Sequence, residues 1–167
     1  MIVVLMGVVG AGKTTIGRLL AQRLRWEFVD ADSFHSNENV EKIRHGIPLD
    51  DNDRAPWLNA IRKAVEQWIA ELRDVVLACS ALKKIYREQL NVSPEVKFVF
   101  LKGDSDLIAE RLHSRKGHFA TEELLASQFA ILEEPRGAIV VDVNGSPETV
   151  VEEVLLRLRE ECDLPRG

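Results

Sequence analysis

The feature that most constrains this chain is a glycine-rich loop near its N-terminus, GVVGAGKTT, which runs from Gly7 to Thr15. The loop follows the apolar run IVVLM and precedes TTIGRLLAQRL, a stretch of helical period. Gly7, Gly12, Lys13 and Thr14 match the pattern GxxxxGK[ST] in the strand–loop–helix context that its mechanism requires. Glycines let the chain turn tightly, so that backbone N–H groups and the N-terminus of the following helix face phosphate oxygens. The loop therefore predicts binding of a nucleoside triphosphate.

Each residue type in the loop has an expected task. Lys13 should reach the β- and γ-phosphates, and the Thr14 hydroxyl should ligate magnesium, so ATP and Mg²⁺ are the expected cofactors. The same loop occurs in GTPase switches and motors, but we find no guanine-reading NKxD element and no DxxG switch in a strand context, and the chain is short for a motor. These observations favour small-molecule phosphoryl transfer. The predicted phosphate cradle comprises Gly7, Gly10, Ala11, Gly12, Lys13, Thr14 and Thr15.

Length and composition predict one domain over residues 1–167, because a chain that is 46% apolar can bury a sizeable core at this length. The net charge of −5 comes from acidic and basic residues that are well mixed, so we expect no nucleic-acid partner. No segment approaches the roughly 20 apolar residues of a membrane span, so we expect no membrane partner and a cytoplasmic location. Cys79 and Cys162 are too few for a disulfide framework, and Cys79 is expected to be a buried, reduced thiol.

Five short apolar runs alternate with stretches of helical period. They lack polar alternation, as strands buried on both faces do, and so they predict an α/β fold with a parallel sheet covered by helices. The expected strands span residues 2–6, 27–30, 75–79, 97–101 and 138–143.

The N-termini of two expected helices can be predicted from their capping residues. The apolar positions of residues 57–72 recur every three or four residues behind Asp53, the expected N-cap, with Pro56 in the first turn. A second helix should begin at Pro147 with Ser146 as its cap, and its apolar positions are Val150, Val151, Val154, Leu155 and Leu158. We assign the apolar and tryptophan positions of both helices to the core rather than to cofactor contacts.

Polar clusters follow the second and third expected strands. Asp30 and Asp32 come at the end of strand 27–30, where an open parallel sheet faces its ligand crevice. One carboxylate can hold the hydration shell of magnesium and the other can orient an attacking hydroxyl or take its proton, although a simple turn also uses aspartate. Ser80 could approach magnesium or substrate or cap a helix, and Lys83 could reach the substrate.

Two further groups of cations are candidates for binding anions. Arg54 could clamp a carboxylate, or it could be a solvated surface residue. The segment ERLHSRKGHFATEELL carries Arg111, Arg115 and His118, together with Lys116, between two helical stretches, the second capped by Thr121. A mobile basic lid there would exclude water and bring positive charge to the transferred phosphate, whereas the alternative is a solvated charged face.

The order of these motifs resembles the gluconate kinases of the thermoresistant gluconokinase type, within the shikimate kinase-like P-loop group. The resemblance covers residues 3–158 and rests on LMGVVGAGKTT, DADSFHSNENVEKIRHGIPLDDNDRAPWL, VVLACSALKKIYR, LKGD, RKGHF, LLASQFAILEEP and VVDV. It implies transfer of the γ-phosphate of ATP to the 6-hydroxyl of D-gluconate, which gives 6-phospho-D-gluconate and ADP. It also implies a three-layer P-loop kinase fold with a five-stranded parallel sheet, a mobile lid around residues 111–125, and a homodimer.

The resemblance also assigns roles to individual residues. Asp32 is implied as the acceptor-orienting base, and Asp30 as a magnesium partner through water, beside Thr14. The implied catalytic residues are Lys13, Asp32, Arg111 and Arg115, and the implied substrate-binding residues are Asp32, His35, Arg54, Lys83 and His118. The chain departs from the family pattern where Val9 and Ala11 replace Ser, Ser36 replaces Pro and Ile43 replaces Met. None of these departures removes a charge or a metal ligand.

Two other functions remain as alternatives. A shikimate kinase-like enzyme would share the loop, the paired aspartates and an arginine, but a glycine triplet after the third strand would favour it, and this chain has CSALK there. A non-catalytic module could use ATP only to order its lid. The intact Lys13, Thr14 and Asp32 argue against such a module.

Overall fold

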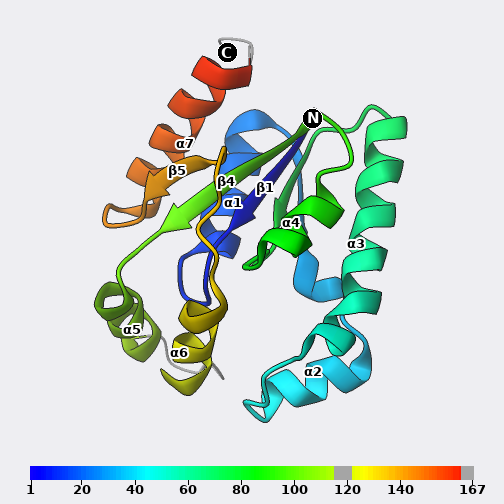
Figure 1. Cartoon of the computed structure of the whole chain (residues 1–167). Coiled ribbons are helices and arrows are strands. Elements are labelled where there is room, and N and C mark those ends of the chain that lie inside the picture. The colour runs from blue at the N-terminus through cyan, green and yellow to red at the C-terminus, as the bar shows by residue number, and fades with distance from the viewer. Residues whose placement is uncertain (115–121, 163–167) are drawn as a thin grey trace.

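All five predicted strands are present in the structure, a computed structural model that describes residues 1–114 and 122–162. Every strand pairing is parallel, and the order across the sheet is β2-β3-β1-β4-β5 (Figure 1). The predicted α/β class with a five-stranded parallel sheet is confirmed. The strands are β1 (Ile2–Met6), β2 (Glu27–Asp30), β3 (Val75–Ala78), β4 (Val96–Lys102) and β5 (Ile139–Asp142).

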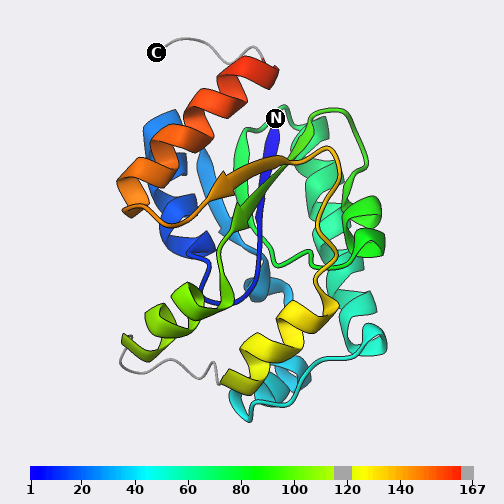
Figure 2. The same ribbon diagram turned by 60° about the vertical axis from the view of Figure 1, so that its left-hand side comes forward.

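Helices cover both faces of the sheet, which gives three layers, and further helices lie at the carboxyl ends of the strands. One face is covered by α1 (Lys13–Leu24) and α7 (Pro147–Cys162), and the other by α3 (Asp51–Ala70) and α4 (Lys84–Leu90) (Figure 2). Beyond the carboxyl ends of the strands lie the 3₁₀ turn η1 (Ala31–Phe34), α2 (Asn37–Arg44), α5 (Ser105–Ser114) and α6 (Glu122–Ile131). Any ligand that binds at the strand ends is therefore enclosed by these four elements.

The central strand β1 is buried along its whole length. Val3 and Leu5 pack into the core under α1 and α7, whereas Ile2, Val4 and Met6 pack into the core under α3 and α4. Because side chains alternate between the two faces of a strand, an uninterrupted apolar run is what a strand covered on both faces requires.

The long helix α3 follows its predicted apolar stripe as far as Trp68, but the prediction was wrong for Leu72, which lies beyond the end of the helix and is 84% exposed. Trp57, Leu58, Ile61, Val65 and Trp68 are all buried against the sheet, at intervals of one to four residues along the helix. The opposite face of α3 is solvated, as in an amphipathic surface helix. Within residues 1–114 and 122–162, no helix is both long enough and apolar enough to cross a membrane.

The start of α3 differs from the prediction. Asp50, not Asp53, is the N-cap, because its carboxylate accepts a hydrogen bond from the Asp53 N–H at 2.8 Å. The Asp53 carboxylate in turn accepts from the Asp50 N–H at 3.2 Å, which completes a capping box. The helix therefore begins one turn earlier than expected, and Pro56 lies in its second turn. At α7 the prediction is confirmed, since the Ser146 hydroxyl accepts from a first-turn N–H and Pro147 begins the helix.

Replacement of the N-cap should destabilise the protein. We expect Asp50→Ala to lower the free energy of unfolding by about 1 kcal/mol, because the side-chain acceptor for an otherwise unpaired N–H is lost. Asp50→Ser, which retains an acceptor, should lose much less. Urea denaturation of the three proteins measures the difference, and an Asp50→Ala variant as stable as the wild type would contradict the capping box.

Candidate active site

The glycine-rich loop joins β1 to α1 at the carboxyl edge of the sheet. Gly10 and Gly12 have φ angles of 82° and 94°, which L-residues with a side chain rarely adopt. Gly12 is also the N-cap of α1, and no side chain in the described part of the protein caps that helix. The first N–H groups of α1 are thus directed at the loop without a side-chain acceptor, which is the arrangement that binds an anion.

The Lys13 side chain folds back over this loop. Its Nζ donates to the carbonyl oxygens of Gly7 at 3.0 Å and Val8 at 2.9 Å. Burial lowers the pKa of Lys13, while the nearby Asp32 and Asp30 carboxylates act in the opposite direction. The ammonium group therefore lies against the loop that the sequence predicts to bind phosphate.

Asp30 and Thr14 converge beside the loop. Asp30 ends β2, and its Oδ2 accepts a hydrogen bond from the Thr14 hydroxyl at 3.0 Å. Its Oδ1 accepts from the Asp32 N–H at 3.1 Å and so caps the turn η1. One hydroxyl and one carboxylate suit Mg²⁺, which prefers oxygen ligands and completes its octahedral shell with water and substrate phosphates. The two residues thus fit the magnesium role predicted for them.

The Asp32 carboxylate is presented to the cleft rather than tied to the protein. Its side chain is 83% exposed, and the Nε2 atom of His35 lies 3.9 Å from its Oδ1. Although the side chain is accessible, the cleft walls exclude part of the water around its carboxylate. This desolvation, and then the Asp30 carboxylate, raise the pKa of Asp32, whereas Lys13 and His35 oppose the rise. An accessible carboxylate with a raised pKa is suited to accept a proton.

Arg54 reaches the cleft from the first turn of α3 and is supported from behind. Its NH1 donates to the Tyr86 hydroxyl at 3.4 Å, and that hydroxyl donates a short hydrogen bond to Asp51. Lys83 Nζ donates to both carboxylate oxygens of Asp51, at 2.7 and 2.9 Å. Lys83 was predicted to contact substrate, but the structure places its ammonium group on Asp51, outside the cleft lining. The four side chains form one network that ends at Arg54.

One cavity of about 220 Å³ brings most of the predicted residues together. It is lined by Lys13, Thr14, Asp30, Asp32, His35 and Arg54, together with Ser80, which caps no helix because α4 begins after Lys83. Sequence reasoning missed two polar contributors to this cavity. Trp57 was assigned to the core alone, and Gln128 of α6 accepts a hydrogen bond from the Val9 N–H of the loop at 2.6 Å. The spacing of three residues between Arg54 and Trp57 on one helix face was the signal that could have found Trp57.

A second cavity, of about 180 Å³, lies on the other side of the loop. Gly10, Gly12 and Thr15 line it together with Arg111, whose NH2 donates to the carbonyl oxygens of Val143 and Gly145. Arg111 thus contacts the segment between β5 and α7 in this structure. Arg115, Lys116, His118 and Thr121 lie outside the described residues.

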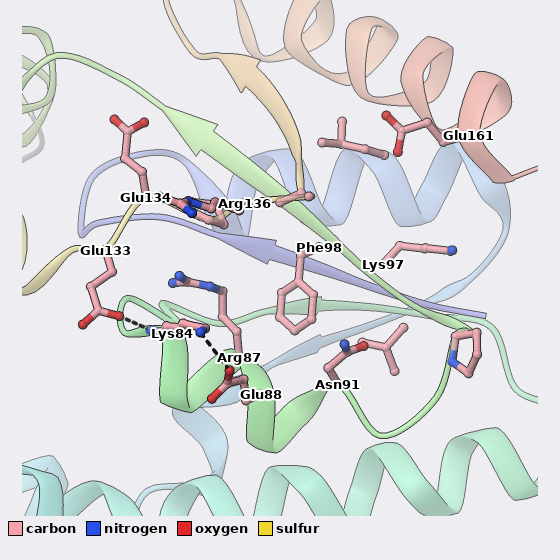
Figure 3. A pocket seen from close by; sticks show the side chains of 16 residues that line it. Lys84, Arg87, Glu88, Asn91, Lys97, Phe98, Glu133, Glu134, Arg136 and Glu161 are labelled. Atoms are coloured by element: carbon pink, nitrogen blue, oxygen red, sulfur yellow. Dashed lines mark hydrogen bonds and ion pairs between the residues drawn. The ribbon is translucent and has the colours of Figure 1, made fainter.

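A larger groove, of about 720 Å³, lies far from the loop, between α4, β4 and the segment before β5 (Figure 3). Within it, Glu133 accepts a hydrogen bond from the backbone N–H of Lys84, and the Lys84 ammonium lies 3.4 Å from Glu88. Arg87 donates to the backbone carbonyls of Ala81 and Leu82. Neither the glycine-rich loop nor the pair Asp30 and Asp32 lines this groove, so the smaller cavity is the candidate site.

Comparison with known proteins assigns the family. The sequence model of the family described as shikimate kinase matches residues 9–159. The chain belongs to the shikimate kinase family. Solved shikimate kinases share its fold at low identity, as does the enzyme from Aquifex aeolicus at 22% identity with a TM-score of 0.60 over 99% of this chain and 100% of that one. Membership of the family and its fold make this chain a P-loop phosphotransferase.

Within the shikimate kinase family, the more similar relatives are named gluconokinases. A probable gluconokinase from Dictyostelium discoideum is 43% identical, covering 95% of this chain and 86% of that protein. The thermoresistant gluconokinase of Escherichia coli K12 is 42% identical, covering 90% and 89%. A crystal structure of a gluconokinase from Sinorhizobium meliloti 1021 is 40% identical with a TM-score of 0.87, covering 96% and 93%. The resemblance drawn from the sequence motifs is confirmed.

The cysteine beside the site should be unreactive. Cys79 follows β3 and is 2% exposed, and burial raises the pKa of its thiol to about 12. At pH 8 the thiol is therefore protonated, whereas the thiolate is the reactive species. In a Cys162→Ser background we expect no reaction of the native protein with Ellman's reagent at pH 8, and one thiol to react after unfolding in guanidinium. Rapid labelling of the folded variant would contradict this prediction.

Proposed function

We propose that this chain catalyses the gluconokinase reaction, in which the γ-phosphate of ATP is transferred to the 6-hydroxyl of D-gluconate. The observation that carries the proposal is the single cleft in which a phosphate-binding loop faces an exposed carboxylate, Asp32, and a cation, Arg54. Relatives named gluconokinases, at 40–46% identity over most of both chains, support the choice of acceptor.

On the nucleotide side, the loop amides and Lys13 would hold the β- and γ-phosphates of ATP. Lys13 would exchange its loop carbonyl partners for phosphate oxygens, which carry the charge of the transition state. Magnesium bound with ATP would neutralise phosphate charge, held by Thr14 directly and by Asp30 through water. The base and ribose would occupy the second cavity, next to Arg111.

On the acceptor side, the residues divide between binding and chemistry. Arg54 would bind the gluconate carboxylate, because a guanidinium can pair with a carboxylate bidentately. His35 would bind acceptor hydroxyls. Asp32 would accept a hydrogen bond from the 6-hydroxyl and take its proton as that oxygen forms a bond to the γ-phosphorus and the bond from phosphorus to the ADP oxygen breaks.

The remaining residues predicted for this reaction lie in the lid segment or contact the site from outside the cleft. We propose that residues 111–125 form a lid on a single domain that spans the whole chain, with Arg115 and His118 directed at the transferred phosphate and the acceptor. Lys83 would support the site from outside the cleft, since its contact with Asp51 leads through Tyr86 to Arg54.

We also propose that the enzyme is a homodimer that acts in the cytoplasm. The dimer follows from the resemblance to gluconate kinases, and the location from the need for ATP and a soluble sugar acid. Light scattering during size-exclusion chromatography tests the dimer, which should have twice the chain mass of 18.8 kDa.

The acceptor can be identified by ADP release in a coupled assay. We expect ADP release to require D-gluconate and to remain at background with shikimate or nucleoside monophosphates. Nucleoside monophosphates lack a carboxylate for Arg54, and the ring of shikimate holds its hydroxyls closer to the carboxylate than the 6-hydroxyl of gluconate, so they would not reach Asp32. Turnover with shikimate in place of gluconate would overturn the proposal in favour of the shikimate kinase-like alternative. ATP binding with no acceptor-dependent ADP release would favour a non-catalytic module.

Substitutions of Asp32 and Lys13 should change the kinetic constants in different ways. We expect Asp32→Asn to lower kcat about 10²-fold or more with little change in the KM for ATP, the range for loss of a general base. Lys13→Ala should impair both kcat and the KM for ATP, because its charge acts in the ground state and in the transition state.

The pH profile checks the same assignment. Because the pKa of Asp32 is raised, wild-type kcat should fall with decreasing pH at a higher pH than an ordinary aspartate would give, and Asp32→Asn should lose that acidic limb. Wild-type turnover in Asp32→Asn would place the base elsewhere.

A further inference from the structure

Trp57 lines the cleft, and besides its apolar packing it makes two specific contacts near Asp32, a hydrogen bond and a ring stack. It is 3% exposed, it occupies the second turn of α3, and it lines the cleft three residues after Arg54. Its indole packs in the core under α3 and α4. An indole combines a large apolar surface with a single N–H donor, and a buried donor requires a partner.

That partner is the backbone immediately before Asp32. Trp57 Nε1 donates to the carbonyl oxygen of Ala31 at 2.7 Å, in a buried hydrogen bond between residues 26 positions apart. This carbonyl belongs to the peptide bond that joins Ala31 to Asp32. The N–H of the same peptide bond donates to Asp30 Oδ1 at 3.1 Å. Both polar groups of one peptide plane are therefore held, and rotation of the plane would break both hydrogen bonds.

Trp57 also holds the ring next to Asp32. The His35 imidazole stacks on the indole with ring centroids 4.6 Å apart and an angle of 8° between the planes. The side chain of His35 is 6% exposed, and its Nδ1 is buried without a hydrogen-bond partner among the described residues. The backbone N–H of His35 donates to the Asp32 carbonyl at 3.2 Å, which closes the turn. Stacking on Trp57 is thus the contact that fixes the plane of this ring.

We propose that Trp57 is a positioning residue that sets the direction in which the Asp32 carboxylate faces the acceptor hydroxyl, an inference that rests on the function proposed above. Asp32 has an exposed side chain, so its aim depends on the backbone that carries it and on the neighbouring ring. Trp57 holds both. Alignment of reacting groups is sensitive to displacements of about 1 Å, which can cost on the order of 10²-fold in rate.

Trp57→Phe tests the hydrogen bond while keeping an aromatic ring for His35. We expect kcat with gluconate to fall about 10-fold or more, while the KM for ATP changes by less than about 2-fold, because the hydrogen bond and the stacking of Trp57 go to Ala31 and His35. Trp68→Phe is the matched control. Trp68 is buried in the same core on the same helix but does not line the cleft, so its replacement should lower the melting temperature and leave kcat unchanged.

Replacement of Trp57 by 3-benzothienylalanine separates the donor from the packing, because sulfur replaces the ring N–H at nearly constant size. This protein should still fold, because the packing is kept and only the donor to the Ala31 carbonyl is lost, and it should show the same loss of kcat. A benzothienyl protein, or a folded Trp57→Phe protein, with wild-type kcat would overturn the positioning role. A loss of stability alone would show that Trp57 serves only the core.

A readout without turnover separates this proposal from the proposed function. Crystal structures of the wild-type and benzothienyl proteins should differ in the orientation of the Ala31–Asp32 peptide and the Asp32 carboxylate. Identical positions in the two structures would overturn the positioning role whatever the acceptor. Failure of the wild type to phosphorylate gluconate would instead contradict the proposed function, and the structural comparison would still decide the role of Trp57.

Discussion

The parallel pairing of β3 with both β1 and β2 is the constraint on which the site depends. Ala78 near the end of β3 is in register with Leu5 on one side and with Asp30 on the other. Three strands that are far apart in the sequence therefore end at one level, and the segments that follow them meet there. A slip of one residue would turn every side chain of a strand to the other face, so the buried apolar faces and the geometry of the site are specified together.

Charge in the cleft is balanced without being neutralised by tight ion pairs. The Lys13 ammonium is held by loop carbonyls, and the carboxylates of Asp30 and Asp32 act on it from across the cleft. This arrangement costs less free energy than burial of an isolated charge, and no tight ion pair has to be broken before a ligand can bind these groups. When a triphosphate enters, its negative charge opposes ionisation of Asp32 and favours the ammonium form of Lys13. Under the proposed function, the triphosphate therefore makes Asp32 a stronger base and keeps Lys13 charged.

The local features of the fold and of the phosphate loop could be predicted from sequence, and the long-range contacts could not. The five strands follow from short apolar runs, although the edge strands β2 and β5 are partly exposed rather than buried on both faces. The start of α7 follows from Ser146 and Pro147. At α3 the sequence DDND offers several possible caps, and only the turn geometry selects Asp50. The support of Arg54 by Tyr86 joins residues 32 positions apart, and the contact of Gln128 with the loop joins residues 119 apart. No local period or spacing reports such pairs, because tertiary packing alone brings them together.

Under the proposed function, helix α3 connects acceptor binding to the alignment of the base. Its first turn carries Arg54 and its second carries Trp57, and the capping box and the buried stripe fix the helix against the sheet. Functional groups on a packed helix are held more precisely than groups on a loop. Under the proposed function, the distance between the cation that binds the acceptor carboxylate and the base that receives the proton is then set by one rigid element. An acceptor of the wrong length would place its hydroxyl away from Asp32 even when its carboxylate is bound, so selection among sugar acids arises from helix geometry as well as from contacts.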